Sequence, residues 1–469
     1  MGEQRIEYAA YSFSVDTETG TLRRLSSGGR SVVYRTFSAL RDEHWGTPTP
    51  RTTLVEAQRR FVFEHDYRPA GYGLDARTTI DHDAATVRVA YAATVSRGFL
   101  RNRLGLCLLL PGTIAGTRVQ VTATRGRIES LALPRRIEPH QPCTDIAALS
   151  FMAGPTSVHI AFAGDVFEME DQRNWTDYSF KVYGTPLDLP FPVRLEPGCR
   201  VEQSITIALR QAAGERGDAR ASRPPRPACE KRTGIRLPSI GTRAPQRAER
   251  NAAEAVALPV DYYRLDVDDD RLADEPARLG ESSHLYRWGR EARASSPRAA
   301  GGSVVVRADP VSATVVPDGA GAGLIGTDGA FAELNRSRPA PRPGMPLVFT
   351  ASPQVHDRDE EAIRDNLFGL RATFDSLRSL YPGHPFGVGL LELTPHFNPA
   401  AGDRAQNAAI RPVDPRLRTT FALAWALAAL CEAAASECRF VTLFDAVGSH
   451  GFLTNGRLVP AAHLLFDLA

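Results

Sequence analysis

Apolar and polar residues alternate along much of the first two hundred positions, which is the pattern of half-buried β-strands. Gly, Pro and Asp clusters separate these segments, and no stretch of helical periodicity stands out between them. We therefore predict a β-sandwich-like domain over residues 1–211. The clearest strand segments are residues 86–91, 118–123, 157–162 and 201–207.

Beyond residue 211 the pattern changes. Residues 212–233 are rich in Arg, Pro, Ala and Gly, which predicts a linker. From residue 234 onward short apolar strands alternate with helical segments, and repeated βα units predict a (β/α)8 TIM-type barrel over residues 234–469. The predicted strands are 234–237, 261–267, 323–328, 346–350, 386–393 and 439–445, and the predicted helices are 360–380 and 417–436.

The first half of this barrel is expected to be trimmed. Residues 268–321 carry little helical pattern and many Ala, Gly, Pro, Ser and Asp residues, and only residues 303–307 resemble a strand. A complete barrel usually takes about 250 residues. The sequence thus predicts a barrel that need not close completely.

Composition and charge narrow the class of protein. A chain of 469 residues favours two domains, and a net charge of +2 argues against nucleic acid or an anionic membrane as the partner. The six cysteines form no CxxC pair, which favours a reducing compartment. The first residues lack an apolar signal segment, and the most apolar run, residues 421–431, is too short to span a bilayer. We expect a cytoplasmic protein that binds a small molecule, with homo-oligomer formation left open.

Candidate chemical groups follow the predicted barrel strands, because the active sites of such barrels lie at the carboxyl ends of the strands. The catalytic candidates are Asp328, His356, Glu392 and Asp445. Asp328 could instead turn the chain or cap a helix, and Glu392 could be one arm of an internal ion pair. Binding candidates from the same strand ends are Glu333, Asn335, Gln354, His396 and Asn398.

Other catalytic signatures are missing from the sequence. There is no GxSxG, P-loop, GxGxxG or HExxH motif, and no histidines stand at metal-ligand spacing. We therefore expect no cofactor, and no local motif calls for a metal, although a metal site assembled across strands stays open.

One polar and aromatic segment stands out in the β-rich half. Residues 164–181 contain five carboxylates together with Arg173, Asn174, Trp175 and Lys181. Lys181 is one of only two lysines in the chain, which indicates a position that needs a compact ammonium group. These four residues are candidates for substrate binding. The alternative is a solvated hairpin joined by salt bridges.

Several motifs in both halves resemble the bacterial D-apionate lactonase family. The resemblance implies an enzyme that opens a branched-sugar lactone in apiose catabolism. The matching segments are residues 164–181, 185–187, 190–192, 102–105, 139–142, 331–336, 352–356, 397–399 and 413–416. The chain departs from the family pattern by its shortened barrel, by Ala330 in place of Tyr, by His396 in place of Arg, and by Asp445 in place of Glu.

The resemblance leads to a hypothesis for the reaction, the hydrolysis of D-apionolactone or a related aldonolactone to the sugar acid. Asp445 or His356 would activate a water molecule, and Asn398 and Gln354 would bind sugar hydroxyls. Lys181 or Arg173 would face the carbonyl oxygen or the product carboxylate, and Trp175 would form an apolar wall for the sugar.

Two alternatives remain open. Glycoside hydrolysis would need a pair of carboxylates from Glu333, Glu392 and Asp445. A non-catalytic carbohydrate-binding homologue would account for the trimmed barrel and for the three departures from the family pattern.

Overall fold

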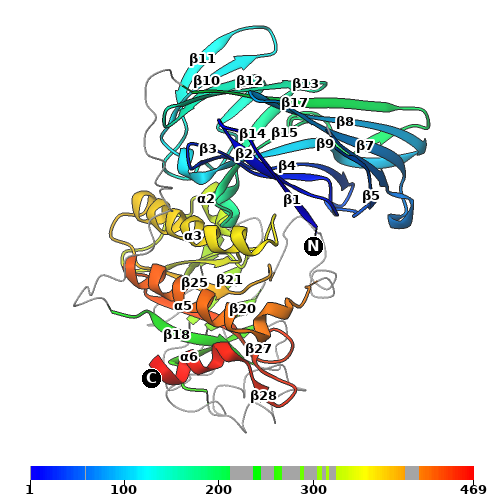
Figure 1. Ribbon diagram of the computed structural model, residues 1–469. Helices are drawn as coiled ribbons and strands as arrows, with labels where there is room; N and C mark the ends of the chain where they lie inside the picture. Colours follow the sequence, from blue (N-terminus) through cyan, green and yellow to red (C-terminus); the bar gives the residue numbers. More distant parts are fainter. Residues whose placement is uncertain are drawn as a thin grey trace. The chain divides into compact units, whose positions relative to one another are not determined.

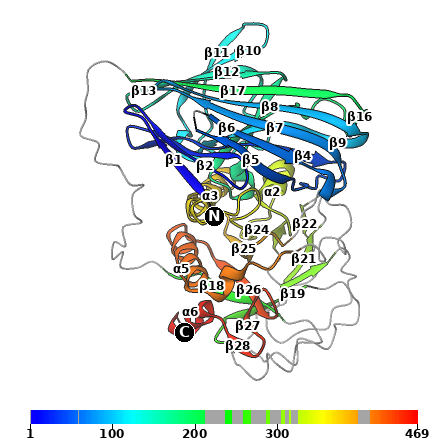
Figure 2. The ribbon, with the colours of Figure 1, turned by 45° about the vertical axis from the view of Figure 1, so that its right-hand side comes forward.

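The computed structural model describes residues 2–58, 60–211, 236–244, 258–266, 286–289, 304–308, 313–315, 324–396 and 411–468. The chain divides into two compact units, which Figures 1 and 2 show as ribbons. The β unit comprises Met1–Gln172 and Ser179–Glu230, and the barrel unit comprises Arg173–Tyr178 and Lys231–Ala469. The predicted linker, residues 212–233, lies outside the described residues.

The β unit is an antiparallel sheet of 17 strands whose two arms share strand β12 (Cys143–Ala153). The first half of β12 pairs with β14, and its second half pairs with β13. The first arm contains, in pairing order, β5 (Arg51–Ala57), β6 (Arg60–Asp66), β7 (Gly73–His82), β8 (Thr86–Arg97), β17 (Arg200–Gln211) and β13 (Thr156–Ala163). The second arm contains β1 (Glu3–Glu7), β2 (Ser12–Asp16), β3 (Thr21–Ser27), β4 (Arg30–Asp42), β9 (Phe99–Pro111), β15 (Ser179–Tyr183) and β14 (Phe167–Asp171). Shorter elements are β10 (Arg118–Ala123), β11 (Ile128–Ala132), β16 (Val193–Leu195), η1 (Arg68–Ala70), η2 (Gly112–Ile114) and η3 (Gln172–Trp175).

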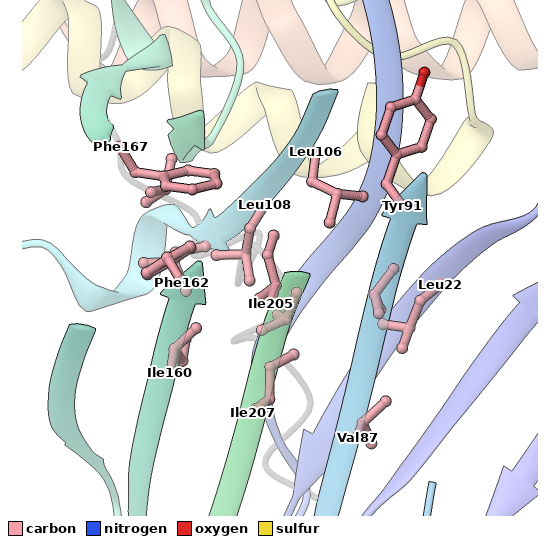
Figure 3. Close-up of a cluster of buried hydrophobic side chains, with 14 of the residues drawn as sticks. Leu22, Val87, Tyr91, Leu106, Leu108, Ile160, Phe162, Phe167, Ile205 and Ile207 are labelled. Carbon is pink, nitrogen blue, oxygen red and sulfur yellow. The ribbon is translucent and has the colours of Figure 1, made fainter. Parts of the chain in front are cut away.

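The two arms bury their apolar faces in one core. Every second residue of β8 is buried, as the alternation of its sequence predicts. Figure 3 shows Val87 of β8 and Ile205 of β17, from the first arm, near Leu22 of β3 and Leu108 of β9, from the second. The prediction of a β-rich first domain is therefore confirmed, and its strands are antiparallel. Because both arms join at β12, the domain is a curled sheet and not two separate sheets.

The barrel unit contains parallel strands that are paired in the order β21-β20-β19-β18-β26-β25-β24-β23, with β22 antiparallel to β21. The first and last of the long strands along the chain, β18 and β26, are neighbours, as a TIM-type barrel requires. Figure 2 shows β24, β25, β26 and β18 together. The bounds are β18 (Ser239–Arg243), β19 (Tyr262–Asp266), β20 (Tyr286–Gly289), β21 (Val304–Ala308), β22 (Ala313–Val315), β23 (Ile325–Gly326), β24 (Leu347–Ala351), β25 (Phe386–Leu391), β26 (Phe440–Val447), β27 (Gly451–Thr454) and β28 (Arg457–Leu458).

The first barrel strand lies further along the chain than predicted. Residues 234–237 were expected to form it, but β18 begins at Ser239, and the described residues 236–238 are not strand. Pro238 has no N–H to donate to a sheet, which explains the later start. Strands β20 to β22 fall within residues 268–321, where only residues 303–307 resembled a strand.

The helices agree with the sequence pattern where that pattern was strong. Helix α3 (Glu360–Leu380) covers the predicted range, whereas the segment predicted as 417–436 divides into η8 (Pro415–Arg418) and α5 (Thr420–Ala435). Thr419 caps α5, its hydroxyl accepting a hydrogen bond from the Phe421 N–H. The short helices α2 (Phe331–Ser337) and α6 (Pro460–Leu468) were not predicted. Across the described ranges, no helix is long and apolar enough to cross a membrane.

Candidate functional site

The acidic and aromatic segment forms a buried hairpin of β14 and β15 in the β unit. Glu168 accepts hydrogen bonds from the Tyr183 hydroxyl at 2.6 Å and from the Leu187 N–H at 2.8 Å. Lys181 Nζ lies 3.4 Å from the carboxylate of Glu170. These carboxylates are therefore neutralised or hydrogen-bonded within the fold, and the hairpin is not solvated as the alternative interpretation assumed. The contact of Lys181 with substrate stays a prediction.

The connecting residues of that hairpin, Arg173–Tyr178, belong to the barrel unit. The Asn335 amide, on α2, donates to Asn174 Oδ1 at 3.0 Å. On α3, Asn366 Oδ1 accepts from the Tyr178 N–H at 2.7 Å. Gly369 leaves room for the Thr176 carbonyl, since a Cβ at residue 369 would stand 2.0 Å from that oxygen. Backbone and side-chain contacts thus fix the segment against α2 and α3.

His356, which follows β24, is held by this connecting segment. Its Nδ1 lies 2.7 Å from Asp177 Oδ2, and burial raises the pKa of Asp177 although His356 opposes the shift. The ring of Trp175 stands edge-on to His356 at 5.6 Å, and the guanidinium of Arg336 lies 5.1 Å from the centroid of Trp175. The structure thus places His356, Trp175 and Asn174 in one cluster. Arg173 is buried beside them on the same segment.

A second cluster of charged residues lies at the carboxyl ends of the barrel strands. Arg243, the last residue of β18, donates from Nε and Nη2 to the two oxygens of Asp445 on β26, at 2.6 and 2.7 Å. Arg411 Nη1 donates to the same carboxylate at 3.2 Å. Burial alone would raise the pKa of Asp445, but these two guanidinium groups outweigh it and hold that pKa below its usual value.

Glu392, directly after β25, has a different environment. It is 3% exposed and forms an ion pair with Arg411 Nη2. Burial, reinforced by the negative charge of Asp445, raises the pKa of Glu392 to about 7. Within the described part of the chain, the second Glu392 oxygen, Oε2, and the Nε of Arg411 have no hydrogen-bond partner. A proton acceptor and a hydrogen-bond donor therefore stand side by side.

Asp328 and His396 complete this second cluster. Arg264, a fully buried residue of β19, donates from Nη2 to Asp328 Oδ1 at 2.6 Å. His396 lies between two groups, with Nε2 3.8 Å from Asp328 Oδ2 and Nδ1 3.2 Å from Arg243 Nη1. The N-cap of α2 is Ala330, so Asp328 does not cap that helix.

Gln354 and Glu333 have other environments. Both ends of the Gln354 amide are engaged, by Asp414 at 2.6 Å and by Arg416 at 2.9 Å. Glu333 lies in the first turn of α2, where burial raises its pKa. Asn398 lies outside the described residues.

Sequence reasoning missed the three arginines of the second cluster. Arg243 was overlooked because the first barrel strand was predicted too early in the chain. Arg264 carried a usable signal, since it is a charged residue in the middle of the predicted strand 261–267. Arg411 followed no predicted strand. A search of the described residues for three or more His, Cys, Asp or Glu side chains able to hold a metal ion finds no such group.

The fold and this cluster define a two-domain protein with a curled antiparallel β domain followed by a TIM barrel that carries ionisable residues at its strand ends. A family model of the D-apionate lactonase N-terminal domain matches residues 2–212, and one of the D-apionate lactonase TIM barrel domain matches residues 313–469. A D-apionate lactonase of Brucella anthropi is 28% identical over 513 residues, which cover 95% of this chain and 83% of that protein. The chain belongs to the D-apionate lactonase family.

Comparison with solved structures gives weaker similarities. A galactose mutarotase-like protein from Lactobacillus casei is 11% identical and aligns over 45% of this chain and 100% of its own, with a TM-score of 0.33. A β-arabinopyranosidase is also 11% identical and aligns over 98% of this chain and 69% of its own, with a TM-score of 0.30. TM-scores this low carry no argument about fold or function.

Proposed function

We propose that this protein is a sugar lactonase that hydrolyses D-apionolactone or a related aldonolactone to the sugar acid. Membership of the D-apionate lactonase family supports the substrate class. The observation that carries the chemistry is the buried ion pair of Glu392 and Arg411, in which Oε2 of Glu392 and Nε of Arg411 make no hydrogen bond to the described residues. The predicted partner is thus a small sugar lactone or its acid, bound in a barrel whose first half is shortened.

Glu392 is the general base in this proposal. A carboxylate with a raised pKa is a stronger proton acceptor than an ordinary one, and it is ionised in a large share of molecules near neutral pH. Asp445 is less suited to this role because Arg243 and Arg411 occupy its oxygens and lower its pKa. His356 is likewise engaged by Asp177. We therefore assign the base to Glu392, ahead of the two residues that the sequence favoured.

The reaction then proceeds through a tetrahedral intermediate. Glu392 takes a proton from water while the water oxygen forms a bond to the lactone carbonyl carbon. The carbonyl oxygen becomes an oxyanion, which the guanidinium of Arg411 stabilises with its Nε–H. When the intermediate collapses, the bond between the carbonyl carbon and the ring oxygen breaks. Glu392 returns the proton to that ring oxygen, giving the hydroxy acid.

The other charged residues of the cluster act as positioning residues. Arg243 and Asp445 form a bidentate pair, and Asp445 also accepts from Nη1 of Arg411, whose Nη2 contacts Glu392. His396 connects Arg243 with Asp328. We propose the sugar hydroxyls as ligands of Gln354, Asn398, Glu333 and Asn335, and the segment of Arg173, Asn174 and Trp175 as a wall of the same site.

Replacement of the base tests the assignment directly. Glu392→Gln keeps the size of the side chain and removes the base, so kcat should fall by about 10²–10⁴-fold. Arg411→Met should lower kcat by about 10²–10³-fold. The matched control is Glu432→Gln on α5, which breaks the ion pair of this buried carboxylate with the half-exposed Arg371 on α3. Equal loss in all three variants, or full activity of Glu392→Gln, would reject the assignment.

Glycoside hydrolysis is supported by one observation. Glu392 and Asp445 are neighbouring carboxylates whose pKa values are moved in opposite directions, as in an acid and nucleophile pair. The bidentate contact of Asp445 with Arg243 weighs against that role, because it occupies both oxygens. Release of nitrophenol from aryl pentosides, lost in Asp445→Asn, would establish this second function. Binding of sugar acid without turnover of either substrate class would indicate a non-catalytic homologue.

A further inference from the structure

An arginine of the β unit, Arg103 on β9, has an unused hydrogen-bonding edge. It is 7% exposed, and among the described residues neither Nε nor Nη2 finds a hydrogen-bond partner. Its Nη1 donates to the carbonyl oxygen of Asn102. The part of the guanidinium that remains is its side edge, where the Nε–H and one Nη2–H point in the same direction.

That edge binds carboxylates elsewhere in this chain. Arg243 donates from Nε and Nη2 to Asp445, and Arg371 donates from Nε and Nη2 to Glu432. In both pairs the fork of two N–H groups matches the two oxygens of one carboxylate. Arg103 presents the same fork without a protein carboxylate.

Two aromatic rings and a second arginine surround the guanidinium of Arg103. The guanidinium carbon lies 5.5 Å from the ring centroid of Trp45 and 5.3 Å from that of Phe191, and the two rings meet edge-to-face. Phe191 is 44% exposed, whereas Arg103 is 7% exposed. Arg101, on the same strand, adds a second cation whose buried Nε has no partner within the described ranges.

We infer that Arg103, flanked by Trp45 and Phe191, is the anchor of a second ligand site, which takes the carboxylate of a small sugar acid. The site consists of β-unit residues alone and does not depend on the proposed hydrolysis. The carboxylate would accept two hydrogen bonds from the Arg103 edge, as Asp445 does from Arg243.

The local charges favour a monoanion that carries hydroxyl groups. Asp165, Glu168 and Glu170 are near enough to oppose the effect of burial, which lowers the pKa of Arg103. A phosphate dianion carries two negative charges, so these three carboxylates would repel it more strongly than a monocarboxylate, which carries one. The same carboxylates can accept hydrogen bonds from ligand hydroxyls.

Calorimetric titration with sodium D-erythronate tests the inference. In the Glu392→Gln background, which retains the barrel residues other than the base, the acid should bind at the β unit whether or not the protein hydrolyses lactones. Arg103→Lys keeps the charge but removes the fork, and it should weaken this binding by roughly 10- to 100-fold. The matched control is Arg77→Lys, an exposed arginine paired with Glu64 on the same unit, and it should bind as the parent does. Erythritol and inorganic phosphate are the probes that separate carboxylate recognition from hydroxyl or general anion binding.

A second measurement does not require the Arg103 variant to fold, because it uses the protein with Arg103 in place. Trp45 is one of four tryptophans, and its fluorescence should change as the acid saturates the neighbouring guanidinium. Trp45→Phe should remove that change. Binding that is unaffected by Arg103→Lys, or no fluorescence change at Trp45 up to saturating acid, would overturn the inference. Equal binding of phosphate would also overturn it, by showing that the site does not select a carboxylate.

Discussion

Arg243 donates hydrogen bonds to both carboxylate oxygens of Asp445, at 2.6 and 2.7 Å. The two residues lie on neighbouring parallel strands, β18 and β26. This bidentate pair is the centre of the charged cluster, because Arg411 and His396 both contact one of its members. Each prediction about the barrel site depends on whether this pair is the scaffold and Glu392 the reacting group.

Removal of Arg243 should destabilise the protein. In Arg243→Met the Asp445 carboxylate stays buried and loses its bidentate partner, keeping the Arg411 hydrogen bond, so the free energy of unfolding should fall by up to about 3–5 kcal/mol. Denaturant unfolding measures the change. The double variant Arg243→Met, Asp445→Leu removes the stranded charge and should recover part of the loss. If the double variant is no more stable than the single one, the loss comes from packing and not from charge.

A longer acid at position 445 should not improve the enzyme. The family pattern that the sequence resembles has Glu there, yet the Asp445 carboxylate already meets both donors of Arg243. An extra methylene displaces the carboxylate from that fork, so Asp445→Glu should lower kcat. Steady-state hydrolysis rates measure the effect. A gain in activity would instead support an eroded site in which Asp445 is the defect.

The rate should depend on the ionisation of Glu392. As the base it must be deprotonated, so kcat/KM should rise as pH increases through about 7 and then level off. Rates measured from pH 5 to pH 9, in buffers of constant ionic strength, define the profile. Glu392→Gln should lose this rise. A wild-type profile that is flat across that range contradicts the role.

Stability should respond to the same group with the opposite trend. The pKa of Glu392 is higher in the folded protein than in the unfolded chain, so the folded state binds more protons between the two values. The contribution of Glu392 to stability is therefore present below the unfolded pKa and is lost as pH rises towards about 7. Thermal unfolding of wild type and Glu392→Gln across this range isolates the effect. The difference between the two proteins should be independent of pH if Glu392 has an ordinary pKa.

The parts of the fold with strong periodicity could be predicted from the sequence. Strand alternation gave β8 and β17, and an amphipathic pattern gave α3 with its observed bounds. Glu392 and Asp445 were identified because strand ends mark the active face of a barrel. The role of Arg243 could not be predicted from the sequence. The first barrel strand was predicted over residues 234–237, so Arg243, the last residue of the observed strand β18, lay outside it.

The sequence also could not show that the residues connecting β14 and β15, Arg173–Tyr178 (the hairpin tip), belong to the barrel unit. Residues 173–178 follow a β-strand in sequence, and only the tertiary contacts with Asn335 and Asn366 assign them to the other unit. Tertiary contacts likewise decide which of the two neighbouring buried carboxylates has the raised pKa and which the lowered pKa. Glu392 and Asp445 differ in their arginine contacts, which no local pattern in the sequence encodes.

The place of the hairpin tip depends on one small residue of α3. Gly369→Ala would bring a Cβ against the Thr176 carbonyl, a backbone atom that cannot rotate away. The free energy of unfolding should fall by about 1–3 kcal/mol through overpacking, although alanine favours the helix. Ser379→Ala, at an exposed position of α3, is the control and should be neutral or slightly stabilising. Stabilisation by Gly369→Ala would show that the tip does not pack there.

Acid release from D-apionolactone by the purified protein, followed with a pH indicator beside the Glu392→Gln variant, tests the central claim most directly. We predict release well above the spontaneous rate for the wild-type protein and a rate near the spontaneous one for the variant. If the wild-type protein releases acid no faster than the spontaneous rate, both from this lactone and from common pentonolactones, the proposed activity is contradicted. Equal release by both proteins would leave the lactonase in place and remove Glu392 as its base.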